Sequence, residues 1–277
     1  MQYDPIKRSL GHVFNQSPIL RKLFYALLDL LLLRTWHVKK AFKQWAKQAP
    51  KEVNILDAGM GFGQYSWFMS RLKPQGTIKG VDVKQEQVTD CNNFFKQAKQ
   101  KNASFEVADL TQFQEVNKYD FVLSVDVMEH IEEDVAVLKN FYASMKKGGI
   151  LLVSTPSDQG GSDVHHHEHE HDHENDGSDS FIDEHVRDGY SIPDIKEKLK
   201  KAGFVKSEAY YSYGWPGKIS WRLSMKYPIL MLNTSKIFFI ILPFYYLITF
   251  PFALILNFLD LQLKHSTGTG LIVKAWK

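Results

Sequence analysis

From Val53 onward, short apolar runs alternate with polar segments of helical period, and this alternation constrains the fold more than any other feature of the chain. Strands that alternate with helices form mostly parallel sheets with helices on both faces. The pattern therefore predicts a doubly wound α/β domain. The expected strands are 53–58, 77–83, 104–108, 119–125 and 149–154, and the expected helices are about 63–72, 85–100 and 132–146.

The chain after this alternation supplies the rest of the domain. Ser191 opens a segment with a capping-box-like pattern, which predicts another helix, and Gly203 is placed to end it. Two further strand candidates lie at 204–213 and 269–276. We therefore expect the domain to comprise residues 51–214 and 267–277, interrupted by an insertion at 215–266.

Residues 1–50 precede the alternating pattern and are expected to contain two helices. Ser17 and Pro18 have the pattern of a capped helix start. Apolar residues at helical spacing then form one wide face: Leu20, Leu23, Phe24, Leu27 and Leu31. A basic helix at roughly 36–48 carries Trp36, Phe42 and Trp45 among its lysines. These helices either lie on a membrane surface or form a lid packed on the domain.

A glycine-rich turn, LDAGMGFG at 56–63, directly follows the first expected strand. Glycine lets the backbone turn tightly and approach a ligand, and the helix that follows offers free N–H groups to a carboxylate. The spacing is G-x-G-x-G and position 64 is Gln, so the dinucleotide pattern G-x-G-x-x-G is not met. An aspartate stands at or directly after the end of each of the next three strands, at the edge where open α/β sheets bind ligands. These are Asp82, Asp109 and Asp126.

Together these segments resemble the class I S-adenosylmethionine-dependent methyltransferases, including the ubiquinone-biosynthesis O-methyltransferases. LDAGMGFG resembles the first motif of that family, GVDV the second, VADL the adenine-side acid and YDFVLSVDVMEHI the fourth-strand motif, and GGILLVSTP is similar to the fifth strand. The resemblance covers about residues 50–214 and 268–277. It implies a Rossmann-like, mostly parallel seven-stranded sheet whose last strand is antiparallel.

The resemblance also implies a cofactor site. In this family the glycine turn flanks the methionine part of S-adenosylmethionine, the second-strand acid holds the ribose and the third-strand acid faces the adenine amine. Each acid alone could merely cap a strand–helix turn, but four in order and in register favour the site. The implied binding residues are Asp57, Ala58, Gly59, Gly61, Gly63, Asp82, Val83, Asp109, Leu110, Val125 and Asp126.

Asp126, Glu129 and His130 stand at i, i+3 and i+4, which would put them on one face of a helical turn. Such oxygen and imidazole ligands suit Mg²⁺, Mn²⁺ or Zn²⁺, and His185, after the fifth strand, is a fourth candidate ligand. The pattern resembles the E-x-x-E-H metal site of ubiquinone-biosynthesis and small-RNA 2′-O-methyltransferases, with Asp at the first position here. The alternative is a pocket floor without a metal, in which His130 or His185 acts as the catalytic base.

Two further features bear on the environment of the chain. Six histidines within 165–173 lie in an acidic, low-complexity loop at 160–180. Such a tract binds Zn²⁺ or Ni²⁺ in vitro whether or not biology uses it. Cys91 is the single cysteine, which excludes an internal disulfide and fits a reducing compartment, so we expect a structural thiol.

The insertion contains 23 consecutive residues without a formal charge, 237–259, which is enough to span a membrane. Pairing of 204–213 with 269–276 would keep both flanks on one side, and we expect Pro243 and Pro251 to break the run. The insertion is therefore predicted to be an interfacial or re-entrant hairpin on a membrane, with a homodimer interface as the alternative. Its expected interfacial rings are Trp215, Trp221, Tyr227, Tyr245 and Tyr246, and its expected lipid-facing cations are Lys218, Arg222, Lys226 and Lys236.

These observations predict a cytoplasmic methyltransferase, peripheral or monotopic on the inner face of a membrane. Its expected substrate is a lipid-soluble phenol, quinone precursor or aryl lipid that is methylated on oxygen. A net charge of +3 is too small to indicate nucleic acid as a partner. Three alternatives stay open: a methyltransferase of a soluble metabolite with a dimerising insertion, a nucleotide-binding oxidoreductase, and a non-catalytic metal-binding module.

Overall fold

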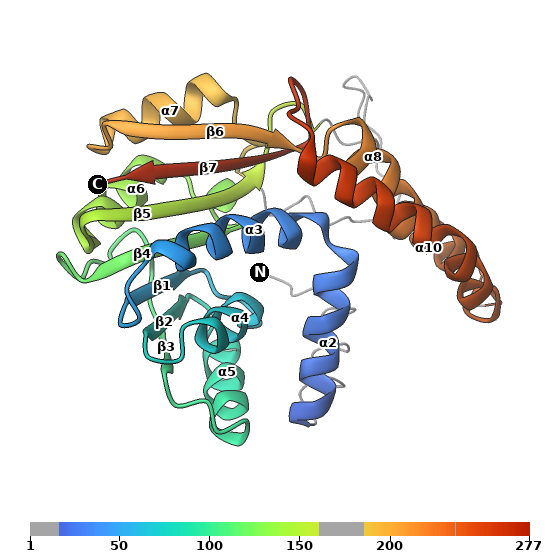
Figure 1. The fold of residues 1–277 in the computed structure, drawn as a ribbon, viewed down its shortest axis with the longest axis horizontal. Helices are drawn as coiled ribbons and strands as arrows, with labels where there is room; N and C mark the ends of the chain where they lie inside the picture. The colour runs from blue at the N-terminus through green and yellow to red at the C-terminus, as the bar shows by residue number, and fades with distance from the viewer. Residues whose placement is uncertain (1–16, 161–185, 236) are drawn as a thin grey trace, which may run out of the picture.

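A computed structural model describes residues 17–160, 186–235 and 237–277, and it confirms the predicted seven-stranded sheet (Figure 1). The strands lie in the order β3-β2-β1-β4-β5-β7-β6. Only β7 runs antiparallel to its neighbours, β5 and β6. The strands are β1 (Asn54–Ala58), β2 (Thr77–Asp82), β3 (Ala103–Val107), β4 (Tyr119–Val125), β5 (Met145–Pro156), β6 (Lys206–Ser212) and β7 (Gly270–Trp276).

The parallel register brings the carboxyl ends of the central strands to one edge of the sheet. Ala58 at the end of β1 pairs with Val81 of β2 and with Ser124 of β4. Asp82 at the end of β2 pairs with Val107, the last residue of β3. The segments that follow these strands therefore start side by side, as a ligand site at this edge requires.

Helices cover both faces of the sheet because its strands are apolar on both sides. One face carries α3 (Leu33–Gln48), α4 (Gln64–Leu72) and α5 (Gln85–Gln97), and the other carries α6 (Asp134–Ser144) and α7 (Ile192–Lys201). Trp45 of α3 packs on Phe121 of β4, with ring centroids 4.5 Å apart. The predicted Ser191 cap is also confirmed, because its hydroxyl accepts the N–H of Asp194 at the start of α7.

The helix α2 (Pro18–Leu31) begins at the predicted Ser17 cap, whose hydroxyl accepts the N–H of Leu20 at 3.2 Å. Its buried residues are Arg21 and Tyr25, which face the domain. The predicted apolar face is instead substantially exposed, because Leu23 is 51% and Leu27 39% exposed. One side of α2 therefore packs on the domain, as the lid interpretation requires, while its apolar side faces outward.

The insertion folds into helices that extend away from the sheet (Figure 1). They are α8 (Trp215–Trp221), a π-helical segment (Arg222–Lys226), α9 (Tyr227–Thr234) and α10 (Phe238–Gln262). The prediction that Pro243 and Pro251 break the apolar run is wrong, since α10 is continuous through both. Each proline removes one hydrogen bond from a helix of 25 residues, and the bonds on either side keep the helix intact. By length and composition alone, α10 could cross a membrane.

The base of the insertion is fixed by Asp260, which lies near the end of α10 and is fully buried. Its carboxylate accepts the backbone N–H groups of Tyr213 and Gly217 at 3.2 and 3.1 Å. It also contacts His37 of α3 at 2.9 Å and His265 at 3.2 Å. One carboxylate thus joins the two ends of the insertion to each other and to the N-terminal helices, a contact that the sequence analysis did not predict.

Candidate functional site

The glycine turn adopts a backbone that other residues rarely adopt. Gly59, Gly61 and Gly63 have φ angles of 74°, 49° and 73°. The N–H groups of Gly59 and Met60 both donate to the carbonyl of Val81, which ties the turn to the end of β2. A Cβ on Gly59 would lie 2.3 Å from the Val127 side chain, whereas a Cβ on Gly61 would meet no atom within 4 Å. The turn therefore packs tightly at its first glycine and opens outward at its second, as a loop that cradles a ligand must.

Asp57 and Ala58, at the end of β1, lie beneath this turn. Both are buried, and the Asp57 carboxylate accepts the hydroxyl of Ser66 at 2.6 Å. Burial raises the pKa of Asp57 to about 7, against the opposing effect of the Ser66 hydrogen bond. Asp57 thus supports the turn from below and holds the first turn of α4 through Ser66.

Asp82 stands beside the turn at the end of β2. One of its carboxylate oxygens accepts the N–H of Gly61 at 2.9 Å, and the other accepts the N–H of Lys84 at 3.0 Å. Each oxygen keeps acceptor capacity, because a carboxylate has about four lone-pair positions. Val83 next to it is 59% exposed at the same edge. The acid therefore shapes the turn and can still accept ribose hydroxyls.

Asp109 follows β3 at the same edge and is exposed. Its carboxylate accepts both the N–H and the hydroxyl of Thr111 at 2.8 Å. Leu110 beside it is 5% exposed and packs into the core, which fixes the position of the acid. This arrangement leaves Asp109 able to meet the adenine end of a cofactor that lies across β1 and β2.

Asp126 follows β4 and forms an ion pair that the sequence did not predict. Its φ angle is 52°, and its N–H donates to the carbonyl of Ser154 at 2.9 Å. Its carboxylate accepts a hydrogen bond from the guanidinium of Arg34, in the first turn of α3. Val125 before it is half-buried against the sheet face that α3 covers. The N-terminal helices therefore contribute a charged side chain to the edge of the sheet that the family motif assigns to the cofactor.

The predicted common face of Asp126, Glu129 and His130 is wrong. Asp126 has a positive φ and lies outside any helix, and the short 3₁₀ helix η1 covers only Met128–His130. Glu129 is 1% exposed and accepts the hydroxyl of Thr155 at 3.0 Å, whereas His130 is exposed. Burial raises the pKa of Glu129. Its carboxylate points into the domain while the imidazole of His130 points out of it.

These positions do not fit the metal site that the resemblance implied. Among the described residues, no three Asp, Glu, His or Cys side chains converge as metal ligands. His185, the fourth candidate ligand and second candidate base, and the histidine tract at 165–173 lie outside the described residues. We therefore assign no catalytic step to a metal.

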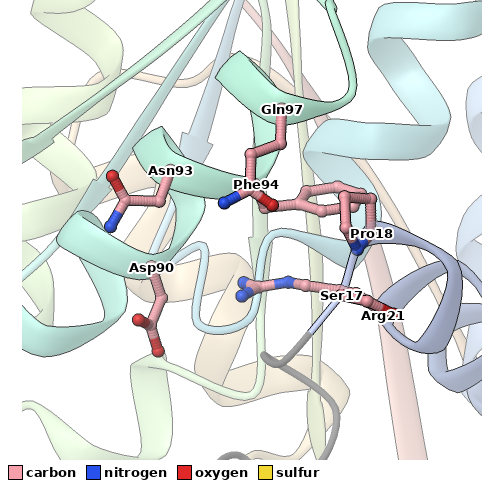
Figure 2. A pocket seen from close by; sticks show the side chains of 7 residues that line it. All are labelled: Ser17, Pro18, Arg21, Asp90, Asn93, Phe94 and Gln97. Carbon is pink, nitrogen blue, oxygen red and sulfur yellow. The ribbon is translucent and has the colours of Figure 1, made fainter.

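The helix α2 holds the glycine turn from above, which the sequence also did not predict. The carbonyl of Phe62 accepts hydrogen bonds from the Tyr25 hydroxyl and from the Arg21 guanidinium, the latter at 2.9 Å. Beside this contact a hollow of about 110 Å³ lies between the start of α2 and α5 (Figure 2). It is smaller than the roughly 300–1,000 Å³ of small-molecule sites and lies away from the strand ends. It is lined by Ser17, Pro18, Arg21, Asp90, Asn93, Phe94 and Gln97.

Comparison with known proteins decides the family. A model of the methyltransferase domain matches residues 49–203. The chain belongs to the methyltransferase family. Its family is that of the class I S-adenosylmethionine-dependent methyltransferases, as the motifs predicted, and this match disfavours the oxidoreductase alternative.

Its relatives include both N- and O-methyltransferases. The chain is 26% identical to (S)-coclaurine N-methyltransferase of Papaver somniferum over 148 residues, which are 53% of this chain and 39% of that protein. It is 27% identical to the ubiquinone biosynthesis O-methyltransferase of Pelagibacter ubique over 120 residues, 43% of this chain and 49% of that one. The matches thus span less than half the length of these relatives.

A solved structure shows the same fold. Phosphoethanolamine N-methyltransferase 2 of Haemonchus contortus, in complex with S-adenosyl-L-methionine, superposes with a TM-score of 0.58 and 16% identity. The match covers 87% of this chain and 52% of that one. At this identity the likeness shows the fold alone.

Proposed function

We propose that this methyltransferase acts at the inner, cytoplasmic face of a membrane and methylates an oxygen of a lipid-soluble small molecule such as a phenol, a quinone precursor or an aryl lipid. The observation that carries the proposal is the attachment of an exposed apolar insertion to the edge of the sheet where the cofactor turn lies. The parallel strand β6 ends at Ser212, and α8 begins at Trp215. The insertion therefore leaves the domain at the carboxyl edge of the parallel strands, where the site is built.

The surface of α10 supports contact with lipid. The helix is apolar on all sides, and exposed fractions reach 70% at Ile240, 67% at Phe244 and 76% at Leu247. The only formal charge in α10 is Asp260, at its buried base. Soluble monomers rarely expose so many large apolar side chains together on one helix. A helix of 25 residues is about 37 Å long at 1.5 Å per residue, enough to reach well into a bilayer.

Internal hydrogen bonds of the insertion also suit an apolar environment. The hydroxyls of Tyr245 and Tyr246 donate to the carbonyls of Leu223 and Ser224 in the π-helical segment, at 2.8 and 2.9 Å. A carbonyl left without a partner in lipid would cost several kcal/mol. These two rings therefore serve the interior of the insertion, and we assign the interfacial role to Trp215 and Trp221, which are 61% and 40% exposed.

The chemistry requires positioning more than activation. S-adenosylmethionine supplies a methyl group that its sulfonium already activates, so the protein must align the acceptor in line with it and accept or release the acceptor's proton. Asp82 and the glycine turn would hold the cofactor at the ends of β1 and β2. Asp126 and Arg34 would border the acceptor site at the end of β4. His130 is exposed and stays the candidate base within the described part of the chain.

Calorimetry tests the cofactor part of this proposal. S-adenosylhomocysteine should bind the full chain with one site, and NADH should not bind. Heat of binding with NADH alone would contradict the assignment. Loss of methyl transfer in EDTA, restored by Mg²⁺, Mn²⁺ or Zn²⁺ and weakened by His185→Ala, would show that the reaction needs the metal to which we assign no step.

Topology tests the membrane part. Reporter fusions before Trp215 and after Lys277 should both report the cytoplasmic side, because β7 must return to the sheet after α10. Reporters on opposite sides would contradict the proposal. A protein that ignores liposomes and elutes as a stable dimer would favour the alternative in which a second copy covers α10 and the substrate is soluble.

A further inference from the structure

The ion pair between Arg34 and Asp126 lies where the acceptor atom must approach. The methyl group of the cofactor is expected at the end of β4, because the family motif places the cofactor across the ends of β1, β2 and β4. Asp126 follows β4 directly, and Arg34 reaches it from α3. The side chain of Asp126 is 28% exposed and that of Arg34 is 39% exposed, so the pair lies at an open edge of the domain.

The backbone around Arg34 is held on both sides. Leu33 and Thr35 are buried, and the Thr35 hydroxyl lies 3.3 Å from that of Tyr65. The N–H of Arg34 donates to the hydroxyl of Tyr213 at 3.1 Å. Tyr213 itself has a φ of 54° and is fixed by Asp260 through its own N–H. The position of the guanidinium is therefore set by the domain and by the base of the insertion together.

The guanidinium has capacity to bind a further group. An arginine carries five N–H donors in a planar fork. Within the described ranges, its side chain has one hydrogen-bond partner, the carboxylate of Asp126. The remaining donors are available to an acceptor oxygen.

The charges around Arg34 disfavour a cationic acceptor. Its positive charge offsets that of Asp126, and Glu129 nearby is buried, which raises its pKa and disfavours its anion. Without Arg34, the carboxylate of Asp126 would attract an ammonium group. With Arg34 in place, the edge offers hydrogen-bond donors and a fixed positive charge instead.

We infer that Arg34 binds the acceptor atom and selects an ionisable oxygen, as in a phenol, over an amine. This inference rests on the proposed function and names the substrate class for that site. The acceptor releases its O–H proton to solvent, either directly or through the candidate base His130, and the guanidinium stabilises the resulting oxyanion. The oxygen then forms a bond to the methyl carbon as the carbon–sulfur bond breaks. The sulfonium becomes a neutral thioether, the oxyanion becomes a neutral ether, and the guanidinium keeps its charge throughout.

The test uses two probes with the same tail, para-nonylphenol and para-nonylbenzylamine, in vesicles that contain anionic lipid. S-adenosylhomocysteine production is measured for the wild type, Arg34→Gln, Arg34→Lys and the control Lys43→Gln, which removes an exposed cation from the same helix. The wild type should prefer the phenol. Arg34→Gln should lower kcat/KM for the phenol roughly 10- to 100-fold, since hydrogen bonds to charged groups are worth about 1.5–3 kcal/mol, and should change the amine less than about threefold. Arg34→Lys should recover part of the loss, and Lys43→Gln should match the wild type.

The pH profile separates binding of the oxygen from a structural role. In the wild type, kcat/KM for the phenol should reach its plateau at a lower pH than in Arg34→Gln, by roughly one unit or more, because a nearby positive charge favours the oxyanion. Equal losses for both probes, an unchanged pH profile, or a wild type that prefers the amine would each overturn the inference. A wild type that does not bind S-adenosylhomocysteine would contradict the proposed function itself. Binding of that product without methylation of either probe would overturn both the lipid-soluble acceptor and the role of Arg34.

Discussion

The sheet and the insertion are both built from apolar residues, but they use them in opposite ways. In the sheet, Ile55 and Leu56 of β1 point to opposite faces and are both fully buried. In α10, Phe239 is 63% exposed and Leu247 is 76% exposed. Burial of the sheet residues stabilises the fold, whereas the apolar surface of α10 contributes little to folding in water. The difference shows that hydrophobic content alone does not identify a core, and that the insertion is apolar for another purpose.

The largest effect should come from charges placed on α10. Ile240→Glu with Leu247→Glu should weaken binding to anionic vesicles at least about 100-fold, because each apolar side chain contributes about 1.5–3 kcal/mol when transferred. Vesicle co-sedimentation measures the binding, and thermal unfolding should change little. Val205→Glu is the control, since Val205 is 99% exposed but precedes β6, at the opposite end of that strand from the insertion. Unchanged vesicle binding in the double variant would contradict the view that the exposed apolar side chains of α10 serve membrane binding.

Substitutions in the glycine turn should have the reverse effect: they should lower the stability of the fold and leave vesicle binding unchanged. Gly59→Ala should lower the free energy of unfolding by more than the roughly 1–2 kcal/mol that a left-handed backbone costs, because its Cβ would also meet Val127 at 2.3 Å. Gly61→Ala should show only the backbone cost, since no atom lies within 4 Å of its Cβ. Urea unfolding measures both. Equal losses would show that the turn relaxes around the added methyl group.

Asp82→Ala should weaken S-adenosylhomocysteine roughly 10- to 100-fold, because hydrogen bonds to an ionised carboxylate are worth about 1.5–3 kcal/mol. Asp82→Asn keeps one acceptor oxygen, so its affinity for S-adenosylhomocysteine should lie between those of the wild type and Asp82→Ala. Calorimetry on folded variants gives the affinities, with vesicle binding as the property that should not move. An affinity equal to that of the wild type would remove Asp82 from the cofactor site.

Asp57 should give the stability of the domain a dependence on pH. Its pKa is raised to about 7 in the folded chain, against about 3.9 in an unfolded one. Between these values the folded state binds more protons, so stability should fall as pH rises from about 4 to about 7. Asp57→Asn should remove this part of the slope in urea unfolding at pH 5 and pH 7.5. An identical slope in both proteins would show that Asp57 does not carry it.

The sequence predicted the sheet well because its signals are local. The runs at 119–125 and 53–58 are short and rich in strand-forming residues, and they lie between polar helical patterns, which indicates buried strands without knowledge of their neighbours. Ser17 and Ser191 were equally readable, because a helix cap depends on residues three positions away. The number of strands and the antiparallel last strand came from the family resemblance rather than from these patterns.

The contacts of the site could not be read in this way. Arg34 and Asp126 are 92 positions apart, and His37 and Asp260 are 223 apart, so no local period connects them. Asp126 was expected on a helical face, but its positive φ turns it away from Glu129 and His130. The two prolines of α10 were given too much weight, because each affects one turn while the rest of the helix remains bonded.

The two ends of the insertion lie next to each other, and this has a consequence for how such a chain can vary. Tyr211 and His265 form an antiparallel bridge, and the N–H of Thr269 donates to the carbonyl of Tyr213. A turn of a few residues could therefore link β6 to β7 directly, as in a plain hairpin. Insertions are tolerated at sites where the two ends already meet. The insertion at 215–266 could therefore be replaced by such a turn. A chain shortened in this way offers a direct route to a water-soluble form of the same domain.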